Sequence, residues 1–321
     1  MQKIINFYDI VIIGASFAGL NCAKALGNSN INVLVLEKNN ELGLKPCGYG
    51  VEDEDIQFIP ESSMNFSLKP LVIVTKNKKH RMPTNQSLIS SICRPDFLNK
   101  LKNELSEFKN IDIKLGQKIT NIEKNKLTAN GLEINFKYLI GADGSFSIVR
   151  KFLGLETKKF IAAVHYTIPK VYPDFEMFVD EQLFDKGYAW IFPNNKFTSV
   201  GAAVDYKSPN LPLLTQNLKR WIEKNNIDIS KGKFAGSIIN YDYQGYKFDN
   251  IYLAGDAAGL ASGLTGKGMY PACASGYQIA KEILGEKCHL IEDWLKIKDK
   301  EEQILELDTN FLELKLQIIE K

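Results

Sequence analysis

A β-α-β pattern stands at residues 8–38, YDIVIIGASFAGLNCAKALGNSNINVLVLEK. An apolar run at 10–13 ends in a glycine turn at 14–19, an alanine-rich helix follows, and a second apolar run at 33–36 ends on the carboxylate of Glu37. Strand, tight turn, helix, strand and acid in this order are typical of a dinucleotide-binding unit. The alternative is a buried β-α-β unit that binds no ligand.

Each part of this pattern has a physical role. Gly14 permits the sharp turn, and Gly19 lets the helix pack closely on the strand. The free amides at the start of the helix face a pyrophosphate, while Glu37, 18 residues beyond Gly19, is placed to accept hydrogen bonds from a ribose. Ser16 stands where the fingerprint has its middle glycine, and its hydroxyl could itself bond a phosphate oxygen.

The composition indicates a globular protein with a large core. The 321 residues are 45% hydrophobic, which predicts two lobes. The 40 basic and 38 acidic residues give a formal charge of +2, so nothing in the composition favours a nucleic-acid partner. Five cysteines without a CxxC pair indicate a reducing cytosol and predict neither a disulfide framework nor a metal site.

The sequence predicts a soluble, cytoplasmic protein, with membrane-peripheral contact left open. No uninterrupted apolar run reaches the roughly 18 residues that cross a bilayer. The first residues have the pattern of a signal peptide, but Asp9 and the glycine turn argue against it.

Two further segments are expected near the ligand. The glycine-rich loop after Glu37 excludes regular structure and brings Cys47 close to whatever the glycines surround. Residues 90–105 read as a loop that enters a helix, with Pro95 in its first turn and Arg94 at its mouth. Arg94 can reach an anionic cofactor, and the alternative for it is a surface ion pair.

A second and a third glycine turn follow. In YLIGADGSFSIVR, residues 138–150, a strand runs into a turn that Asp143 faces. A short strand at 250–254 ends at Asp256, and a helix starts at about Met269. A carboxylate at a strand end can bind a ribityl hydroxyl, and a helix N-terminus offers positive potential to an electron-rich ring. Both features fit a flavin.

Residues 111–115 and 126–136 each suggest a strand, and residues 160–204 are β-rich. Within this last range Tyr188, Trp190 and Phe192 alternate, so they project to one face of a strand. Three aromatic side chains on one face form either a core layer or the wall of an apolar pocket.

The three motifs together carry a family resemblance. With the N-terminal unit, GADGSFSIVR at 141–150 and LAGDAAG at 253–259 resemble the FAD-dependent oxidoreductases of the p-hydroxybenzoate hydroxylase fold. The resemblance implies an α/β fold, with a Rossmann-like FAD-binding domain, an inserted β-sheet substrate domain and a C-terminal helix.

Three more motifs are similar to the geranylgeranyl reductase family, whose enzymes reduce isolated double bonds of isoprenoid chains. They are PCGYG at 46–50, GYAWIFP at 187–193 with Gly201 after it, and TGKGMYPACASG at 265–276. The expected FAD-binding domain is discontinuous, at 1–60, 85–158 and 246–288. The expected substrate domain comprises 61–84 and 159–245, and a helical tail comprises 289–321.

The resemblance also implies functions for single residues. Those expected to hold FAD are Gly14, Ser16, Phe17, Ala18, Gly19, Glu37, Lys38, Lys45, Cys47, Gly48, Arg94, Asp143, Gly144, Gly255, Asp256, Gly266, Gly268 and Met269. Those expected to bind substrate are Tyr188, Trp190, Phe192 and Pro193. Cys47, Tyr188 and Trp190 are the catalytic candidates, and the alternative for Cys47 is a small buried hydrophobe.

The implied reaction is hydride transfer from reduced flavin to a double bond of a geranylgeranyl-type lipid. No second GxGxxG follows a strand, so the sequence indicates no separate nicotinamide domain, and the electron donor is either NAD(P)H or a reduced redox protein. Two alternatives are a flavin-dependent monooxygenase or halogenase on the same fold, and a non-catalytic flavin- or isoprenoid-binding protein.

The C-terminal tail departs from the family pattern, because family members commonly carry a longer C-terminal region. It shows an apolar helical stripe at 304/305, 311/312 and 318/319, with Leu307 and Leu314 between the pairs. Docking on the body of the protein, a dimer partner and a membrane surface remain open for this stripe.

Overall fold

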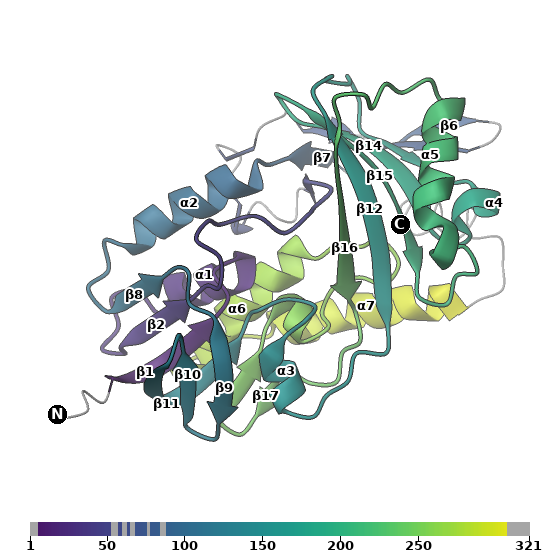
Figure 1. The fold of residues 1–321 in the computed structure, drawn as a ribbon. Coiled ribbons are helices and arrows are strands. Elements are labelled where there is room, and N and C mark those ends of the chain that lie inside the picture. The colour runs from purple at the N-terminus through teal and green to yellow at the C-terminus, as the bar shows by residue number, and fades with distance from the viewer. Residues whose placement is uncertain are drawn as a thin grey trace.

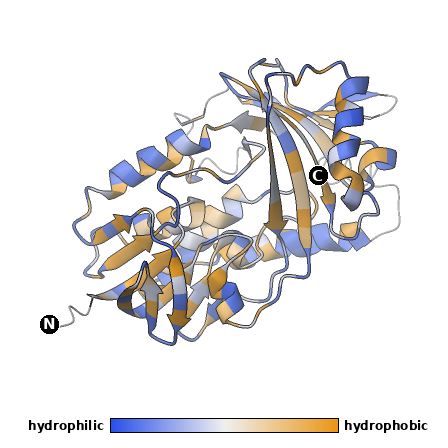
Figure 2. Cartoon of the chain, in the orientation of Figure 1, coloured by the Kyte–Doolittle hydropathy of each residue, from blue (hydrophilic) through white to orange (hydrophobic). Residues whose placement is uncertain are grey.

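The computed structural model describes residues 6–52, 57–59, 63–64, 68–75, 78–83 and 88–306. Figure 1 shows two parts, each built on its own large sheet, with the long helix α7 (Leu290–Glu306) running from one part to the other. Hydrophobic residues concentrate in the strands of both sheets, as Figure 2 shows.

The first sheet has a parallel centre, which is the arrangement that a β-α-β chain dictates. Its strands, in spatial order, are β17 (Lys247–Phe248), β18 (Ile251–Leu253), β11 (Leu132–Gly141), β1 (Asn6–Ile13), β2 (Val33–Leu36) and β8 (Ile111–Lys114). The strands from β18 to β8 pair in parallel, and β17 pairs antiparallel with β18.

Alternating side chains of β1 and β2 enter two different cores. Ile10 and Ile12 of β1 pack with helices α1 (Phe17–Ala25), α2 (Arg94–Leu105) and α6 (Met269–Ile283) on one face. Val11 and Ile13 pack on the other face, in a cluster that Trp294 of α7 joins. Both faces of the parallel sheet are therefore covered.

The prediction for residues 126–136 needs a correction. The segment is not one strand but a hairpin, because β10 (Lys126–Ala129) turns back on β11. The turn is made by Asn130 and Gly131, whose φ angles are 47° and 81°, and Asn-Gly is a strong signal for such a turn. A further strand, β9 (Ile119–Glu123), pairs antiparallel with β10.

The second large sheet is mixed. Its spatial order is β16 (Lys233–Asn240), β12 (Phe160–Ile168), β15 (Thr198–Asp205), β14 (Tyr188–Pro193), β13 (Glu176–Phe178), β5 (Val72–Val74) and β6 (Lys79–Arg81). One face packs on α5 (Leu214–Lys224) through Ile191, Val200 and Trp221. The opposite face carries the alternating aromatic residues of β14.

Several short elements complete the described fold. They are a small sheet of β3 (Gly50–Glu52), β7 (Leu88–Ser91) and β4 (Lys69–Pro70), helices α3 (Ile148–Phe152) and α4 (Glu181–Phe184), and the 3-10 turns Leu211–Leu213 and Gly255–Ala257. Helix α2 begins at Arg94, with Pro95 in its first turn as the sequence predicts.

Helix α7 joins the two cores. Ile291 and Trp294 belong to the core beneath the first sheet, whereas Ile304 and Leu305 pack against the aromatic face of the second sheet. The first pair of the predicted apolar stripe therefore docks on the body of the protein, and its remaining members, beyond residue 306, lie outside the described residues. Among the helices that the structure describes, none has the length and apolar character needed to traverse a bilayer.

Candidate active site

The three glycine turns meet at one edge of the first sheet. Strands β18, β11, β1 and β2 are parallel neighbours, so the residues that follow them emerge side by side. A Cβ atom on Gly14 would lie 2.3 Å from the carbonyl oxygen of Ala142, and one on Gly255 would lie 3.5 Å from the Cβ of Ala18. This edge of an open parallel sheet, where the strand order reverses, is the usual ligand crevice of such folds.

The first turn is held against the end of β2. Gly14 has a φ of 105°, a conformation that favours glycine. The backbone amide of Ala15 donates to Oε2 of Glu37 at 3.1 Å, and Oε1 of Glu37 accepts from the amide of Asn39 at 3.0 Å. A Cβ on Gly19 would lie 1.9 Å from the carbonyl oxygen of Gly14, so only glycine fits there.

A buried arginine lies at the N-terminus of α1. Ser16 is the N-cap residue, but its side chain caps no amide of the helix. Its hydroxyl instead accepts a hydrogen bond from Nη2 of Arg94 at 2.7 Å, and the Arg94 guanidinium carbon lies 5.0 Å from the ring centre of Phe17. Arg94 is 8% exposed, and its Nε has no partner within the described chain. A buried cation beside free helix amides is suited to an anion.

The alternative that Arg94 makes a surface ion pair is not what the structure shows. Its guanidinium is buried and bonds to a hydroxyl rather than to a carboxylate.

Asp256 of the third turn collects groups from distant parts of the chain. Its Oδ2 accepts from the hydroxyl of Ser145 at 3.0 Å and pairs with the ammonium of Lys45. A Cβ on Gly268 would lie 3.5 Å from its Oδ1. Lys45, the second glycine turn and the start of α6 are thus gathered around one carboxylate.

Asp143 has a different setting. Its Oδ2 accepts from the amide of Ile148 at 2.7 Å, so it caps the first turn of α3. Its Oδ1 is buried and has no partner among the described residues, and burial raises the pKa of the carboxyl group. Gly144 follows with a φ of 80°, and a Cβ there would face open space.

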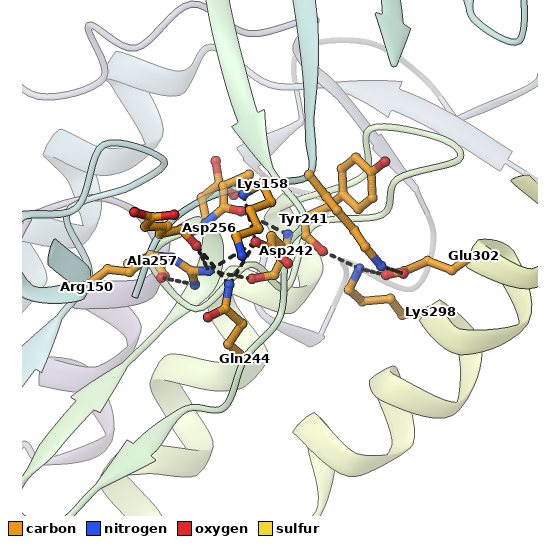
Figure 3. A network of polar contacts seen from close by, with 12 residues as sticks. Arg150, Lys158, Tyr241, Asp242, Gln244, Asp256, Ala257, Lys298 and Glu302 are labelled. Carbon is orange, nitrogen blue, oxygen red and sulfur yellow. Dashed lines mark hydrogen bonds and ion pairs between the residues drawn. The ribbon is translucent and has the colours of Figure 1, made fainter. Parts of the chain in front are cut away.

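Figure 3 shows the polar network that ties the second turn to the third. Arg150, at the end of GADGSFSIVR, is 2% exposed. Its guanidinium donates to the carbonyl oxygens of Ala257 at 3.3 Å and Asp242 at 2.8 Å, and it lies 3.6 Å from the Asp242 carboxylate. The Asp242 carboxylate also accepts from the amide of Lys158 and the side chain of Gln244, both at 2.8 Å. Arg150 therefore fixes the geometry of the turns rather than facing the crevice.

The aromatic residues of β14 form the opposite wall. Tyr188, Trp190 and Phe192 are 5–9% exposed, and their neighbouring ring centres lie 6.0 and 6.2 Å apart. A Cβ on Gly48 would lie 3.6 Å from Phe192, and one on Gly266 would lie 3.5 Å from Oη of Tyr188. The loops PCGYG and TGKG both lie against this aromatic face.

The polar atoms of this face are committed to neighbours. The Tyr188 hydroxyl donates to the carbonyl oxygen of Thr265, and Nε1 of Trp190 donates to the Ser199 hydroxyl at 2.9 Å. Burial raises the pKa of Tyr188. Pro193 ends the strand opposite Thr198.

Cys47 is half-buried in the loop beside the aromatic face. Its sulfur accepts from the backbone amide of Tyr49 at 3.3 Å, and Tyr49 has a φ of 67°. The positive φ at Tyr49 turns the loop back toward the second sheet, where the Tyr49 ring meets His165 edge-on at 6.3 Å.

His165 is a site residue that the sequence analysis did not identify. Its neighbour across the sheet is Gly201, and Gly201 is in turn opposite Trp190, so the three lie in one row. A Cβ on Gly201 would be 2.3 Å from Cζ2 of Trp190 and 2.6 Å from the Cβ of His165. Burial lowers the pKa of His165 to about 4. The sequence pattern that could have identified it is the alternation of Ile161, Ala163 and His165, which places the imidazole on the aromatic face.

The remaining predicted residues lie on α1, shortly after β2 and at the start of α6. Phe17 and Ala18 are buried in the first turn of α1, Lys38 is exposed just after Glu37, and Met269 is the first residue of α6. The described residues contain no group of three or more His, Cys, Asp or Glu that could hold a metal ion.

A cavity of about 450 Å³ lies away from all of these residues. Its lining is Gln57, Phe58, Tyr277, Lys281, Glu286, Lys287, Cys288 and Leu290. We place the chemistry at the strand ends rather than in this cavity, because the buried cation, the carboxylates and the glycine turns converge there.

Comparison with known proteins gives the following relatives. The family model described as pyridine nucleotide-disulphide oxidoreductase matches residues 8–167. An uncharacterized protein of Methanosarcina barkeri is 33% identical over 86% of this chain and 74% of its own length. The digeranylgeranylglycerophospholipid reductase of Methanocaldococcus jannaschii is 25% identical over 92% of this chain and 81% of its own.

Solved structures share the fold. A geranylgeranyl bacteriochlorophyll reductase-like protein from Thermoplasma acidophilum superposes with a TM-score of 0.75 at 20% identity, covering 92% of this chain and 84% of its own. PqsL, a probable FAD-dependent monooxygenase from Pseudomonas aeruginosa, gives a TM-score of 0.67 at 19% identity, covering 92% of both chains.

Proposed function

Because the chain belongs to the geranylgeranyl reductase family of FAD-dependent oxidoreductases, we propose that it reduces carbon–carbon double bonds of an isoprenoid lipid. The observation that supports this proposal is the aromatic face of β14, which lies against the PCGYG and TGKG loops beside the crevice at the strand ends. An oily chain needs such a wall, whereas a small polar substrate would need more free polar groups there.

The residues at the strand ends fit FAD. Arg94, with its unpartnered Nε, and the uncapped start of α1 would hold the diphosphate. Glu37 would accept from the ribose, and Asp256 from the ribityl chain. When bound and reduced, FAD supplies the hydride. The other predicted cofactor residues, from Lys38 and Lys45 to Met269, would complete the cradle.

The aromatic residues would position the lipid and exclude water. Partial positive charge on the alkene carbon next to the protonated one would be stabilised by the faces of Tyr188, Trp190 and Phe192. Tyr188 is poorly suited to give up its proton, because its hydroxyl is bound to Thr265 and burial raises its pKa. Cys47 would lie near the isoalloxazine, because it precedes Gly48, which approaches the aromatic face.

We also propose which parts of the chain bind FAD and which bind the substrate. Residues 1–60, 85–158 and 246–288 would bind FAD, 61–84 and 159–245 would bind substrate, and helix α7 of the tail would pack on the substrate side. NAD(P)H or a reduced redox protein would supply the electrons.

Anaerobic reoxidation tests the function. The FAD-loaded protein is reduced with dithionite, freed of excess reductant and mixed with a geranylgeranyl lipid. Recovery of the oxidised flavin spectrum, with two hydrogens gained by the lipid for each reduced bond in mass spectrometry, is the expected result. A flavin that stays bleached with every isoprenoid would contradict the proposal. An oxygen-dependent hydroxylated or halogenated product would point to the monooxygenase and halogenase alternative.

A further inference from the structure

Helix α7 carries a glutamate on the face that packs against the substrate side of the site. Ile304 and Leu305 of α7 pack against the cluster that contains Tyr188. Residues three and four apart share one face of a helix, so Glu301 lies on the face that carries these two apolar side chains. The helix also contacts the loop before α6, because a Cβ on Gly263 would lie 3.1 Å from Cδ1 of Leu305.

This carboxyl group is buried and only partly satisfied. Glu301 is 9% exposed, and its Oε2 has no hydrogen-bond partner within the described chain. The nearby ammonium of Lys298 is committed elsewhere, to the carbonyl oxygen of Tyr241 at 2.7 Å and to the carboxylate of Glu302. A buried polar atom without a partner calls for a functional explanation.

One loop of polar groups lies near both Glu301 and the aromatic wall. Ser262 lies close enough to Glu301 to influence the pKa of its carboxyl group, and the Ser262 hydroxyl accepts from Oγ1 of Thr265 at 2.9 Å. The carbonyl oxygen of Thr265 accepts the hydroxyl of Tyr188. The loop 262–265 therefore lies beside both Glu301 and the aromatic face on which the substrate is proposed to lie.

The environment favours the neutral form of Glu301. Burial is the main influence and raises the pKa of its carboxyl group, and the charge of Glu52 acts in the same direction. Ser262, Lys267 and Lys298 oppose this shift. Lys267 is itself paired with Glu52, at 2.9 Å, so its field at Glu301 is partly cancelled.

We infer that Glu301 is the proton donor in the reduction of the double bond, an assignment that rests on the proposed function. The O–H bond of Glu301 breaks and its proton forms a C–H bond with one alkene carbon. The other carbon takes the hydride that reduced FAD supplies. The carboxylate that remains then regains a proton from water.

Single-turnover reoxidation tests the assignment. Glu301→Gln keeps the size and hydrogen-bonding capacity of the side chain but removes the acidic proton, and Glu306→Gln, at an exposed position of the same helix, is the matched control. Glu301→Gln is expected to slow lipid-dependent reoxidation about 100-fold or more, with Glu306→Gln within a few-fold of wild type. Reoxidation by dioxygen, which needs no proton at carbon, is expected to stay unchanged in both variants. Glu301→Asp should recover part of the rate.

A second measurement reads the proton directly and does not depend on turnover. Infrared difference spectra of the FAD-loaded protein at neutral pH should show the carbonyl stretch of a protonated carboxyl group, which shifts in deuterated water and is lost in Glu301→Gln. Absence of that band, or a Glu301→Gln variant that reduces the lipid at the wild-type rate, would overturn the assignment and leave the proposed function standing. A wild-type protein that shows the band but is never reoxidised by an isoprenoid would overturn the proposed function and, with it, the alkene as the proton acceptor.

Discussion

Ser16 and Arg94 are 78 positions apart in the chain, yet the Ser16 hydroxyl accepts a hydrogen bond from the Arg94 guanidinium at 2.7 Å. The serine that interrupts the glycine fingerprint thereby orients a buried cation at the N-terminus of α1. The departure from the usual motif adds a positioning contact at the place where an anionic diphosphate would bind.

Arg94→Ala is therefore expected to weaken FAD binding about 10- to 100-fold, because a charge-assisted hydrogen bond contributes roughly 1.5–3 kcal/mol. The FAD affinity of Arg94→Lys should lie between those of wild type and Arg94→Ala, since an ammonium does not reproduce the planar fork of donors. Titration of the apoprotein with FAD, followed by flavin fluorescence, measures the affinity. Arg81→Ala is the control, because Arg81 is exposed and pairs with Asp174 on the second sheet. Equal affinity of Arg94→Ala and wild type would remove Arg94 from the site.

Gly201 makes room for the row formed by His165 and Trp190. Gly201→Ala would place a methyl group 2.3 Å from Trp190 and 2.6 Å from His165. We expect a loss of about 1–3 kcal/mol of unfolding free energy from overpacking. Gly236→Ala, on strand β16 of the same sheet, is the matched control, because its nearest contacts would be 3.4 Å away. Urea unfolding should show a lower free energy of unfolding for Gly201→Ala than for Gly236→Ala. Similar values for the two variants would show that the aromatic face repacks around the added methyl group.

His165 makes stability depend on pH. Its folded pKa of about 4 lies below the ordinary value of 6.5, so the unfolded chain binds more protons between these values. Folding therefore has no protonation cost from His165 above pH 6.5, and the free energy of unfolding decreases as the pH falls toward about 4. His165→Gln should remove a destabilisation of about 2–3 kcal/mol at the acid end. Comparing wild type and variant by urea unfolding at neutral pH and near pH 4 measures it, and parallel pH profiles would show that the imidazole is not buried in this way.

Much of the site could be predicted because its motifs are local. About ten residues of sequence are enough to predict each of three elements, through glycine, proline or alternation. They are the turn at Gly14, the helix that begins at Arg94 and the strand that carries Trp190. The C-terminal ends of the parallel strands β1, β11 and β18 are neighbours, so the turns that follow these strands meet at one edge of the sheet.

What could not be predicted depends on contacts across the chain. The partner of Ser16 is not visible in its own segment, and neither is the row that joins His165 to Trp190 through Gly201. Glu301 looks like one more charge on a polar helix until α7 is seen docked on the aromatic cluster. The hairpin at Asn130 had a local signal, the Asn-Gly pair, which the strand prediction for 126–136 passed over.

Arg150 offers the sharpest test of how the cofactor turns are held together. Its buried guanidinium satisfies the carbonyl oxygens of Ala257, Asp242 and Glu156. Arg150→Met keeps an apolar stem of similar length but leaves these acceptors and the Asp242 carboxylate without the cation, which typically costs about 3–5 kcal/mol. Because Arg150 joins the second turn to the third, Arg150→Met should lower both the free energy of unfolding in urea and the affinity for FAD.

Lys151→Met, at the exposed neighbouring position, is the control and should change neither quantity. An Arg150→Met variant of wild-type stability that binds FAD weakly would instead place the guanidinium in direct contact with the cofactor, since a purely structural role cannot lower affinity without lowering stability.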